Sequence, residues 1–193
     1  MNESKIKEFL DSWAKGVIEI GKVYSKKEDF EKEALKFLSK HYAFKTQQIL
    51  FKPTFTKEKI FRNNLDDALS YFVKGKFSED NGFALKPWEE INLQELSILN
   101  EENLSTAMGT LSFKPVSSSE TTLVAFTFVF CLEDGEIKIK IHHSSPVLWP
   151  LIFMKSKPLE ISIVGAGIGG LVAALALKKR GHKPIIYEKT ESL

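Results

Sequence analysis

The chain has 193 residues, of which 43% are hydrophobic, and its formal net charge at pH 7 is +2. This length accommodates one ordinary domain and an appendage, and the near-neutral charge gives no electrostatic basis for binding nucleic acid. The N-terminal stretch is charged and lacks the apolar run of a secretory signal, and the single cysteine excludes an internal disulfide and a thiolate metal cluster, so we expect a cytoplasmic protein without a metal site.

The first part of the chain begins with patterns typical of helices. Apolar residues recur at helical spacing between Ile6 and Ile20, which predicts an amphipathic helix that covers a sheet. A second helix is predicted over residues 27–42 and a short third helix over residues 66–73. A short strand at residues 48–51 separates these two helices.

The next part of the chain is dominated by strands. Residues 105–113, 121–131 and 137–143 alternate or run apolar, and an Asp-Gly pair at residues 134–135 predicts a hairpin between the last two strands. Helices first and strands afterwards favour an α+β fold in which helices pack on one face of a curved antiparallel sheet.

Several segments give this part of the chain a resemblance to a known fold. They are Leu50-Phe-Lys-Pro-Thr54, residues 81–88, Ala107-Met-Gly109 and the final His142-His-Ser-Ser145. With the N-terminal helix, they resemble the nuclear-transport-factor-like, or SnoaL-like, cone fold, and the last strand is similar to the association domain of calmodulin-dependent kinases. The resemblance implies a cone domain over residues 1–148 with a pocket for a small-molecule ligand, and we expect a homodimer.

The last predicted strand contains the candidate catalytic residue. Strict alternation places Ile139, Ile141 and His143 on the apolar inner face and His142 towards water. A pocket histidine with a pKa near neutrality can act as a general acid or base, so His143 is the candidate. The alternative is a hydrogen-bonded structural histidine at the end of the sheet.

Other residues of the predicted domain admit two interpretations. The stripe Phe126, Phe128 and Phe130 predicts core packing, with a ligand-specific aromatic wall as the alternative. A set of loop residues could form a cationic rim that favours an anionic ligand, or could be solvated surface: Lys52, Arg62, Lys86 and Trp88.

A proline-containing basic stretch over residues 149–158 predicts a linker, and the segment over residues 159–193 then reads as an incomplete Rossmann-type βαβ unit. Residues 161–164 and 184–187 predict strands, and residues 169–180 predict a helix. Gly165 permits the tight turn, Gly167 lets the backbone approach a pyrophosphate, the helix begins at about Gly169, and Gly170 allows close packing of helix on strand. Glu188 stands where an acid accepts hydrogen bonds from a ribose.

Residues 157–189, with the run Gly165-Ala-Gly-Ile-Gly-Gly170, resemble the N-terminus of flavin-dependent aromatic-hydroxylase-type monooxygenases. The resemblance implies FAD, with the glycines near its pyrophosphate and Glu188 on its ribose. A membrane span over residues 161–177 is the alternative, but this run is short for a hydrocarbon core, so no membrane contact is expected.

Three functions are compatible with these patterns. The first is a ligand-binding or oligomerising cone domain that carries the start of an FAD-dependent monooxygenase and is not catalytically complete alone. The second is the N-terminal part of a fused FAD-dependent oxidoreductase. The third is a small cone-fold isomerase or cyclase that uses His143.

Overall fold

The computed structural model describes residues 1–45, 47–102, 104–147 and 158–189. The chain divides into two compact units, Met1–Val147 and Leu148–Leu193, and each is described here by itself. The linker predicted over residues 149–158 lies almost wholly outside the described ranges. Within those ranges, no helix has the length and apolar character needed to cross a membrane.

Three helices of the first unit begin at side chains that cap their free backbone N–H groups. They are α1 (Glu3–Ser25), α2 (Phe30–His41) and α3 (Leu65–Val73). The side chains of Asn2, Asp29 and Asn64 each accept a hydrogen bond from the backbone N–H three residues further on. These caps explain where the helices start, close to the positions that periodicity predicts.

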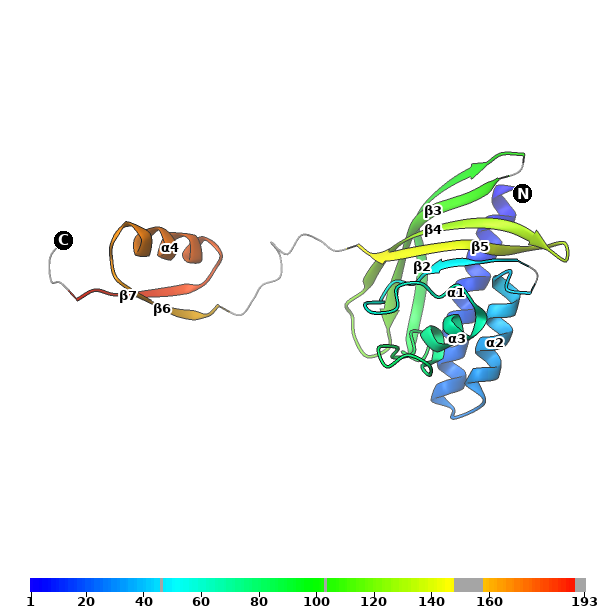
Figure 1. Cartoon of the computed structure of the whole chain (residues 1–193), viewed down its shortest axis with the longest axis horizontal. Coiled ribbons are helices and arrows are strands. Elements are labelled where there is room, and N and C mark those ends of the chain that lie inside the picture. The colour runs from blue at the N-terminus through cyan, green and yellow to red at the C-terminus, as the bar shows by residue number, and fades with distance from the viewer. Residues whose placement is uncertain (46, 103, 148–157, 190–193) are drawn as a thin grey trace. The chain divides into compact units, whose positions relative to one another are not determined.

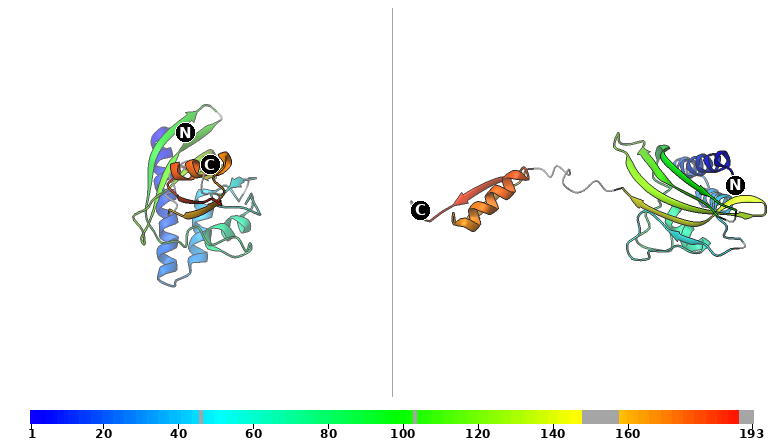
Figure 2. Two further views of the ribbon diagram at one scale, coloured as in Figure 1. Left: turned by 90° about the vertical axis from the view of Figure 1, so that its left-hand side faces the viewer. Right: turned by 90° about the horizontal axis from the view of Figure 1, so that it is seen from above.

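The sheet of the first unit has the strand order β1-β5-β4-β3-β2. Its strands are β1 (Leu50–Lys52), β2 (Trp88–Asn100), β3 (Ser105–Pro115), β4 (Thr122–Glu133) and β5 (Glu136–Pro146). β1 pairs with β5 in parallel, and the other pairs are antiparallel. Figures 1 and 2 show the strands curving around the helices, which confirms the predicted α+β cone fold.

Strand β2 was not predicted from the sequence. It lies at the edge of the sheet, pairs only with β3, and has two register irregularities. Only Trp88 and Ile91 are buried among its residues, so its sequence lacks the alternation of a half-buried strand. Edge position and bulges together remove the pattern on which a strand prediction depends.

A bulge in β5 reverses the expected orientation of its last residues. Phe130 pairs with Ile139 and Val129 pairs with Ile141, so Lys140 is an extra residue without an opposite partner. Beyond the bulge, the inward-facing residues are His142 and Ser144, and both are buried. The prediction that His143 faces inward is therefore wrong: His143 is exposed, because one added residue changes the parity of the strand.

The second unit consists of β6 (Glu160–Val164), α4 (Ile168–Lys179) and β7 (Lys183–Tyr187). The two strands are parallel, with Val164 opposite Tyr187, as a partial Rossmann-type unit requires. No residue of α4 is buried, although the helix is apolar on all sides. The residues that form the alternative membrane span are therefore a strand, a glycine turn and part of a helix.

Candidate functional site

A small cavity lies between the helices and the inner face of the sheet of the first unit. Its volume of about 10 Å³ is enough for roughly one water molecule. Its walls are mostly carbon, from Trp13, Phe51, Phe72, Phe83, Leu111, Phe113, Val124, Phe126 and Phe128. The polar side chains among its lining residues, apart from the indole of Trp13, are Thr54, Tyr71, His142 and Ser144. We refer to it as the inner cavity.

The hydroxyl groups of Thr54 and Ser144 form a hydrogen-bonded pair in this cavity. Their oxygens are 2.9 Å apart, and both residues are buried. The parallel pairing of β1 with β5 places Lys52 opposite His143, which brings the segment after β1 beside Ser144. The Lys52 ammonium donates a hydrogen bond to the backbone oxygen of Ser144 at 2.9 Å and strengthens this junction.

The phenol of Tyr71 enters the cavity from α3. Its hydroxyl is buried and makes no hydrogen bond that meets ordinary geometry with the described residues. Burial raises the pKa of this phenol above its usual range, and the nearby backbone of Phe55 and hydroxyl of Thr54 offset only part of the effect. The ring stacks on Phe83 with centroids 5.4 Å apart. Tyr71 is thus a protonated donor for which a bound ligand could supply an acceptor.

His142 completes the polar set. Burial lowers the pKa of its imidazole well below the usual value, and electrostatic interactions with His143 and Lys52 act in the same direction. Its Nδ1 lies 2.8 Å from the Tyr42 hydroxyl, and its ring stacks on Phe51 at 4.6 Å. Near neutral pH the imidazole is therefore uncharged and held in one orientation.

An open cleft of about 520 Å³ adjoins the inner cavity, because Tyr71 and Phe83 line both. Two of the four predicted rim residues, Lys86 and Trp88, line this outer cleft, and the Lys86 ammonium lies 4.6 Å from the Trp88 ring. Lys86 and Trp88 therefore lie at a cleft that shares lining residues with the inner cavity.

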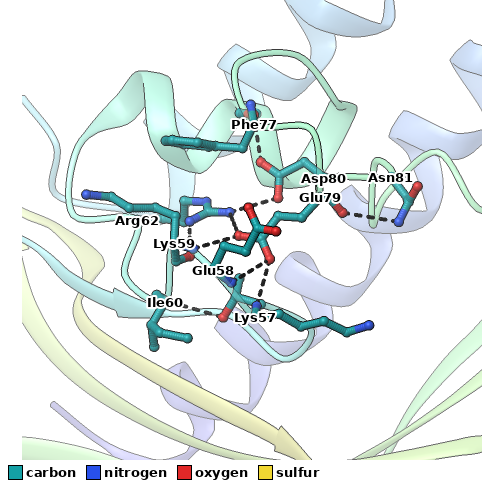
Figure 3. Close-up of polar contacts among 11 residues, drawn as sticks. Lys57, Glu58, Lys59, Ile60, Arg62, Phe77, Glu79, Asp80 and Asn81 are labelled. Carbon is teal, nitrogen blue, oxygen red and sulfur yellow. Dashed lines mark hydrogen bonds and ion pairs between the residues drawn. The ribbon is translucent and has the colours of Figure 1, made fainter.

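Arg62, also predicted at a rim or in solvent, is instead fully buried (Figure 3). Its guanidinium pairs with Asp80 at 2.9 Å and with Glu79 at 3.1 Å. The Glu79 carboxylate accepts hydrogen bonds from the backbone N–H groups of residues 57–59, and these bonds lower its pKa to about 2. Asp80 also accepts a hydrogen bond from Ser70, next to Tyr71. The cluster fastens the loop that follows Thr54 to the helix that carries Tyr71.

The predicted cofactor residues form a glycine turn in the second unit. Gly165 has φ +101°, which glycine alone adopts readily, and a Cβ on Gly170 would lie 2.0 Å from the Gly165 carbonyl oxygen. Gly167 and Gly169 have open space on the side where a Cβ would stand. Glu188, predicted to bind a ribose, accepts a hydrogen bond from the backbone N–H of Ala166 at 2.6 Å.

Sequence reasoning missed Thr54, Tyr71, His142 and Ser144 as a site. Thr54 and the His-Ser end of β5 both lie in segments that stood out for their resemblance to the cone fold, yet their convergence depends on the parallel β1–β5 pair and on the bulge. Among the described residues, no three His, Cys, Asp or Glu side chains gather in a way that could hold a metal ion. The chemistry available in the cavity is that of hydroxyls and one neutral imidazole.

Comparison with known proteins identifies the first unit. Residues 4–146 match the family described as metal-independent carbonic anhydrase. The metal-independent carbonic anhydrase of Nostoc sp. (strain PCC 7120) is 31% identical over 151 residues, which are 75% of this chain and 73% of that protein. The crystal structure of a cyanobacterial iota-carbonic anhydrase complexed with bicarbonate matches with a TM-score of 0.72 and 29% identity, over 77% of this chain and 94% of that one.

A more distant structure shares the fold alone. A putative calcium/calmodulin dependent protein kinase II association domain from Xanthomonas campestris matches with a TM-score of 0.57 and 17% identity, over 76% of this chain and 89% of that chain. This match agrees with the cone fold that the sequence predicts.

The second unit has short matches. Residues 163–193 match an NAD(P)-binding Rossmann-like domain. The FAD-dependent monooxygenase atnJ of Arthrinium sp. is 61% identical over 36 residues, which are 19% of this chain but only 9% of that enzyme. These matches agree with a dinucleotide-binding type of segment and extend no further along the chain.

These findings overturn the predicted functions. A binding or oligomerising cone that carries the start of a monooxygenase is wrong as the main function, because the match to carbonic anhydrases spans residues 4–146. The alternatives, a fused FAD-dependent oxidoreductase and an isomerase or cyclase that uses His143, are wrong on the same ground. The chain belongs to the metal-independent carbonic anhydrase family.

Proposed function

We propose that the first unit catalyses the reversible hydration of carbon dioxide to bicarbonate. The observation that carries this proposal is the Thr54–Ser144 hydroxyl pair beside the unpartnered Tyr71 phenol in an aromatic cavity. The related iota-carbonic anhydrase that was crystallised with bicarbonate supports the same ligand class here. In this conformation the inner cavity holds about one water-sized molecule, so carbon dioxide and water together require Tyr71 and Phe83, which separate it from the outer cleft, to move apart.

The two kinds of surface in the cavity suit the two reactants. Carbon dioxide has no net dipole, so the aromatic walls hold it without an unpaired polar group. The Thr54 and Ser144 hydroxyls each donate and accept, so they can hold and orient a water molecule beside it. The outer cleft that shares Tyr71 and Phe83 with the cavity is the proposed entrance.

In the proposed reaction the water oxygen forms a bond with the carbon of carbon dioxide. One C=O electron pair moves to the oxygen that becomes charged, and the Tyr71 hydroxyl donates a hydrogen bond to that oxygen. The proton lost by the water leaves through the Thr54–Ser144 pair, in which each oxygen gains one proton and releases another, and solvent water or buffer at the outer cleft accepts it. Carbon dioxide and water thus give bicarbonate and one proton, and the reverse sequence returns them.

The experiment is stopped-flow measurement of carbon dioxide hydration with a pH indicator, supported by ¹⁸O exchange. Thr54→Val, Ser144→Ala and Tyr71→Phe should each lower kcat/KM by roughly 10²-fold, the effect of removing one preorganised hydrogen bond at a transition state. Thr127→Val and Ser145→Ala are matched controls, because both side chains lie on the outer face of the sheet. A wild-type rate equal to that of buffer, or full activity in all three variants, would contradict the proposal.

We further propose that the second unit binds the pyrophosphate of a dinucleotide, with FAD as the cofactor that the sequence resemblance implies. The positive φ of Gly165 and the open space at Gly167 and Gly169, next to the first turn of α4, support this. The Glu188 carboxylate accepts from the Ala166 N–H through one oxygen and has further lone pairs with which it could accept a ribose hydroxyl. Fluorescence titration of the full chain with FAD and with NAD tests the proposal, and Gly167→Val should abolish any binding while leaving the fold intact.

A further inference from the structure

A buried chain of three side chains lies behind the inner cavity. The indole Nε1–H of Trp13, on α1, donates to the hydroxyl oxygen of Tyr42 at 3.2 Å. The same hydroxyl lies 2.8 Å from Nδ1 of His142 on β5. All three residues are buried, with exposed fractions of 3%, 0% and 4%. Water therefore does not compete for these hydrogen bonds.

The donor in each bond follows from the chemistry of the groups. An indole N–H can only donate, so the Tyr42 oxygen accepts from Trp13. The single hydroxyl hydrogen of Tyr42 is then available for His142. If His142 Nδ1 donated instead, this hydrogen would have no acceptor among the described contacts, and a buried donor would be left unsatisfied. The arrangement in which Tyr42 donates to Nδ1 is therefore preferred.

The protonation of His142 then follows. A neutral imidazole has one N–H, and Nδ1 is occupied as an acceptor, so the hydrogen resides on Nε2. The charged and titratable groups near the ring are Lys52, His143 and Tyr42, and the Lys52 ammonium opposes a second proton on the imidazole. The ring edge that bears Nε2 is directed away from Tyr42, and His142 is among the residues that line the inner cavity.

We infer that Trp13 and Tyr42 fix His142 as the Nε2–H tautomer, so that it donates a hydrogen bond to a carbonate-type anion in the inner cavity and does not act as a base. This inference rests on the proposed carbonic anhydrase function for the identity of the anion, but the tautomer itself does not. Trp13 and Tyr42 are positioning residues, since they act through His142. The cavity then offers two fixed donors, His142 and Tyr71, to the charge that develops on bicarbonate.

The test is an NMR measurement of the full chain labelled with ¹⁵N-histidine. Long-range ¹H–¹⁵N correlations separate a protonated from an unprotonated ring nitrogen, and the four histidines can be assigned with single His→Gln variants. We expect His142 to show an unprotonated Nδ1 and a protonated Nε2 at every pH from 6 to 9. A protonated Nδ1, or an imidazolium in this range, would overturn the inference whether or not the enzyme is active.

Two variants test the role of the hydrogen-bonded side chains Trp13, Tyr42 and His142. Trp13→Phe keeps an aromatic ring but removes the donor to Tyr42, so the Tyr42 hydroxyl can reverse and His142 should become a mixture of tautomers. Tyr42→Phe should have the same effect. Trp88→Phe is the matched control for the tautomer alone, which it should leave unchanged, because the Trp88 indole donates to the Phe83 carbonyl instead. The Trp13 and Tyr42 variants should also lower kcat by about 5–10-fold with a smaller change in KM.

An unchanged tautomer in both variants would refute the positioning role. The wild-type spectrum decides the tautomer even if a variant does not fold. If the tautomer is as inferred but the chain does not hydrate carbon dioxide, the proposed function fails and the tautomer assignment stands.

Discussion

Arg62 and Asp80 form an ion pair in which both side chains are almost completely buried, with nitrogen and oxygen 2.9 Å apart. The pair joins the loop that follows Thr54 to the segment that follows α3. Because each charge depends on the other for compensation, the pair controls the stability of the region that surrounds the inner cavity.

Arg62→Met should therefore destabilise the first unit by roughly 3–5 kcal/mol, because it leaves Asp80 buried without its cation. Urea unfolding followed by tryptophan fluorescence measures the change. Lys45→Met is the matched control: its pair with Asp134 is exposed, so its loss should leave the free energy of unfolding almost unchanged. Similar losses in the two variants would show that the Arg62 pair does not have this role.

Tyr71→Phe should separate stability from activity. Removing a buried hydroxyl that lacks a hydrogen-bond partner should leave the unfolding free energy unchanged or raise it by up to about 1–3 kcal/mol. The same change should remove the donor to the developing bicarbonate. Tyr42→Phe provides the contrast, because that hydroxyl bonds to Trp13 and His142 and its loss should destabilise the unit. A clear loss of stability in Tyr71→Phe would mean that its hydroxyl has a partner in solution.

Stability should decrease as the pH falls from about 6.5 to about 4. Burial is the main cause that lowers the pKa of His41 to about 4, so in this range the unfolded chain binds a proton that the folded chain does not. The contribution is about 3 kcal/mol over the whole range, and buried His142 acts in the same direction. His41→Gln should make the pH dependence of urea unfolding shallower, whereas Ser145→Ala, which removes no titratable group, should not. Equal slopes in all three proteins would contradict this assignment.

Carbon dioxide hydration should survive metal removal. The polar groups of the inner cavity are hydroxyls and one imidazole. Among the described residues, no cluster of three or more His, Cys, Asp or Glu side chains could hold a metal ion. Dialysis against EDTA or dipicolinate should leave kcat/KM within about twofold of its starting value. Added Zn²⁺ should not raise kcat/KM, because zinc in proteins is bound by several Cys, His, Asp or Glu side chains and not by neutral hydroxyls. A rate that falls with chelation and returns with Zn²⁺ would require different chemistry.

Much of the fold could be predicted from local patterns, because periodicity reports directly which face of an element is buried. The helices α1, α2 and α3, the Asp134-Gly135 hairpin and three of the long strands follow these patterns closely. The edge strand β2 does not, since bulges and one-sided pairing weaken its alternation. The homodimer remains a prediction.

The candidate site was less accessible to sequence reasoning. Thr54, Tyr71 and Ser144 are far apart in sequence and meet only through the sheet topology. Arg62 lies in a loop sequence that favours an exposed side chain, and only its two acidic partners explain its burial. The glycine-rich turn of the second unit, in contrast, is a strong local signal over few residues, and it directed the functional prediction away from the larger unit.

The extra residue at Lys140 has a consequence for how strand β5 could change over evolution. The strand ends in His142-His-Ser-Ser145, a doubled arrangement in which each histidine is followed two positions later by a serine. If the irregularity were straightened without loss of a residue, His143 and Ser145 would turn inward and present the same two chemical groups. If Lys140 were deleted, the present pair would keep its orientation. With this duplication, a one-residue shift of register would still place a histidine and a serine on the inner face of β5.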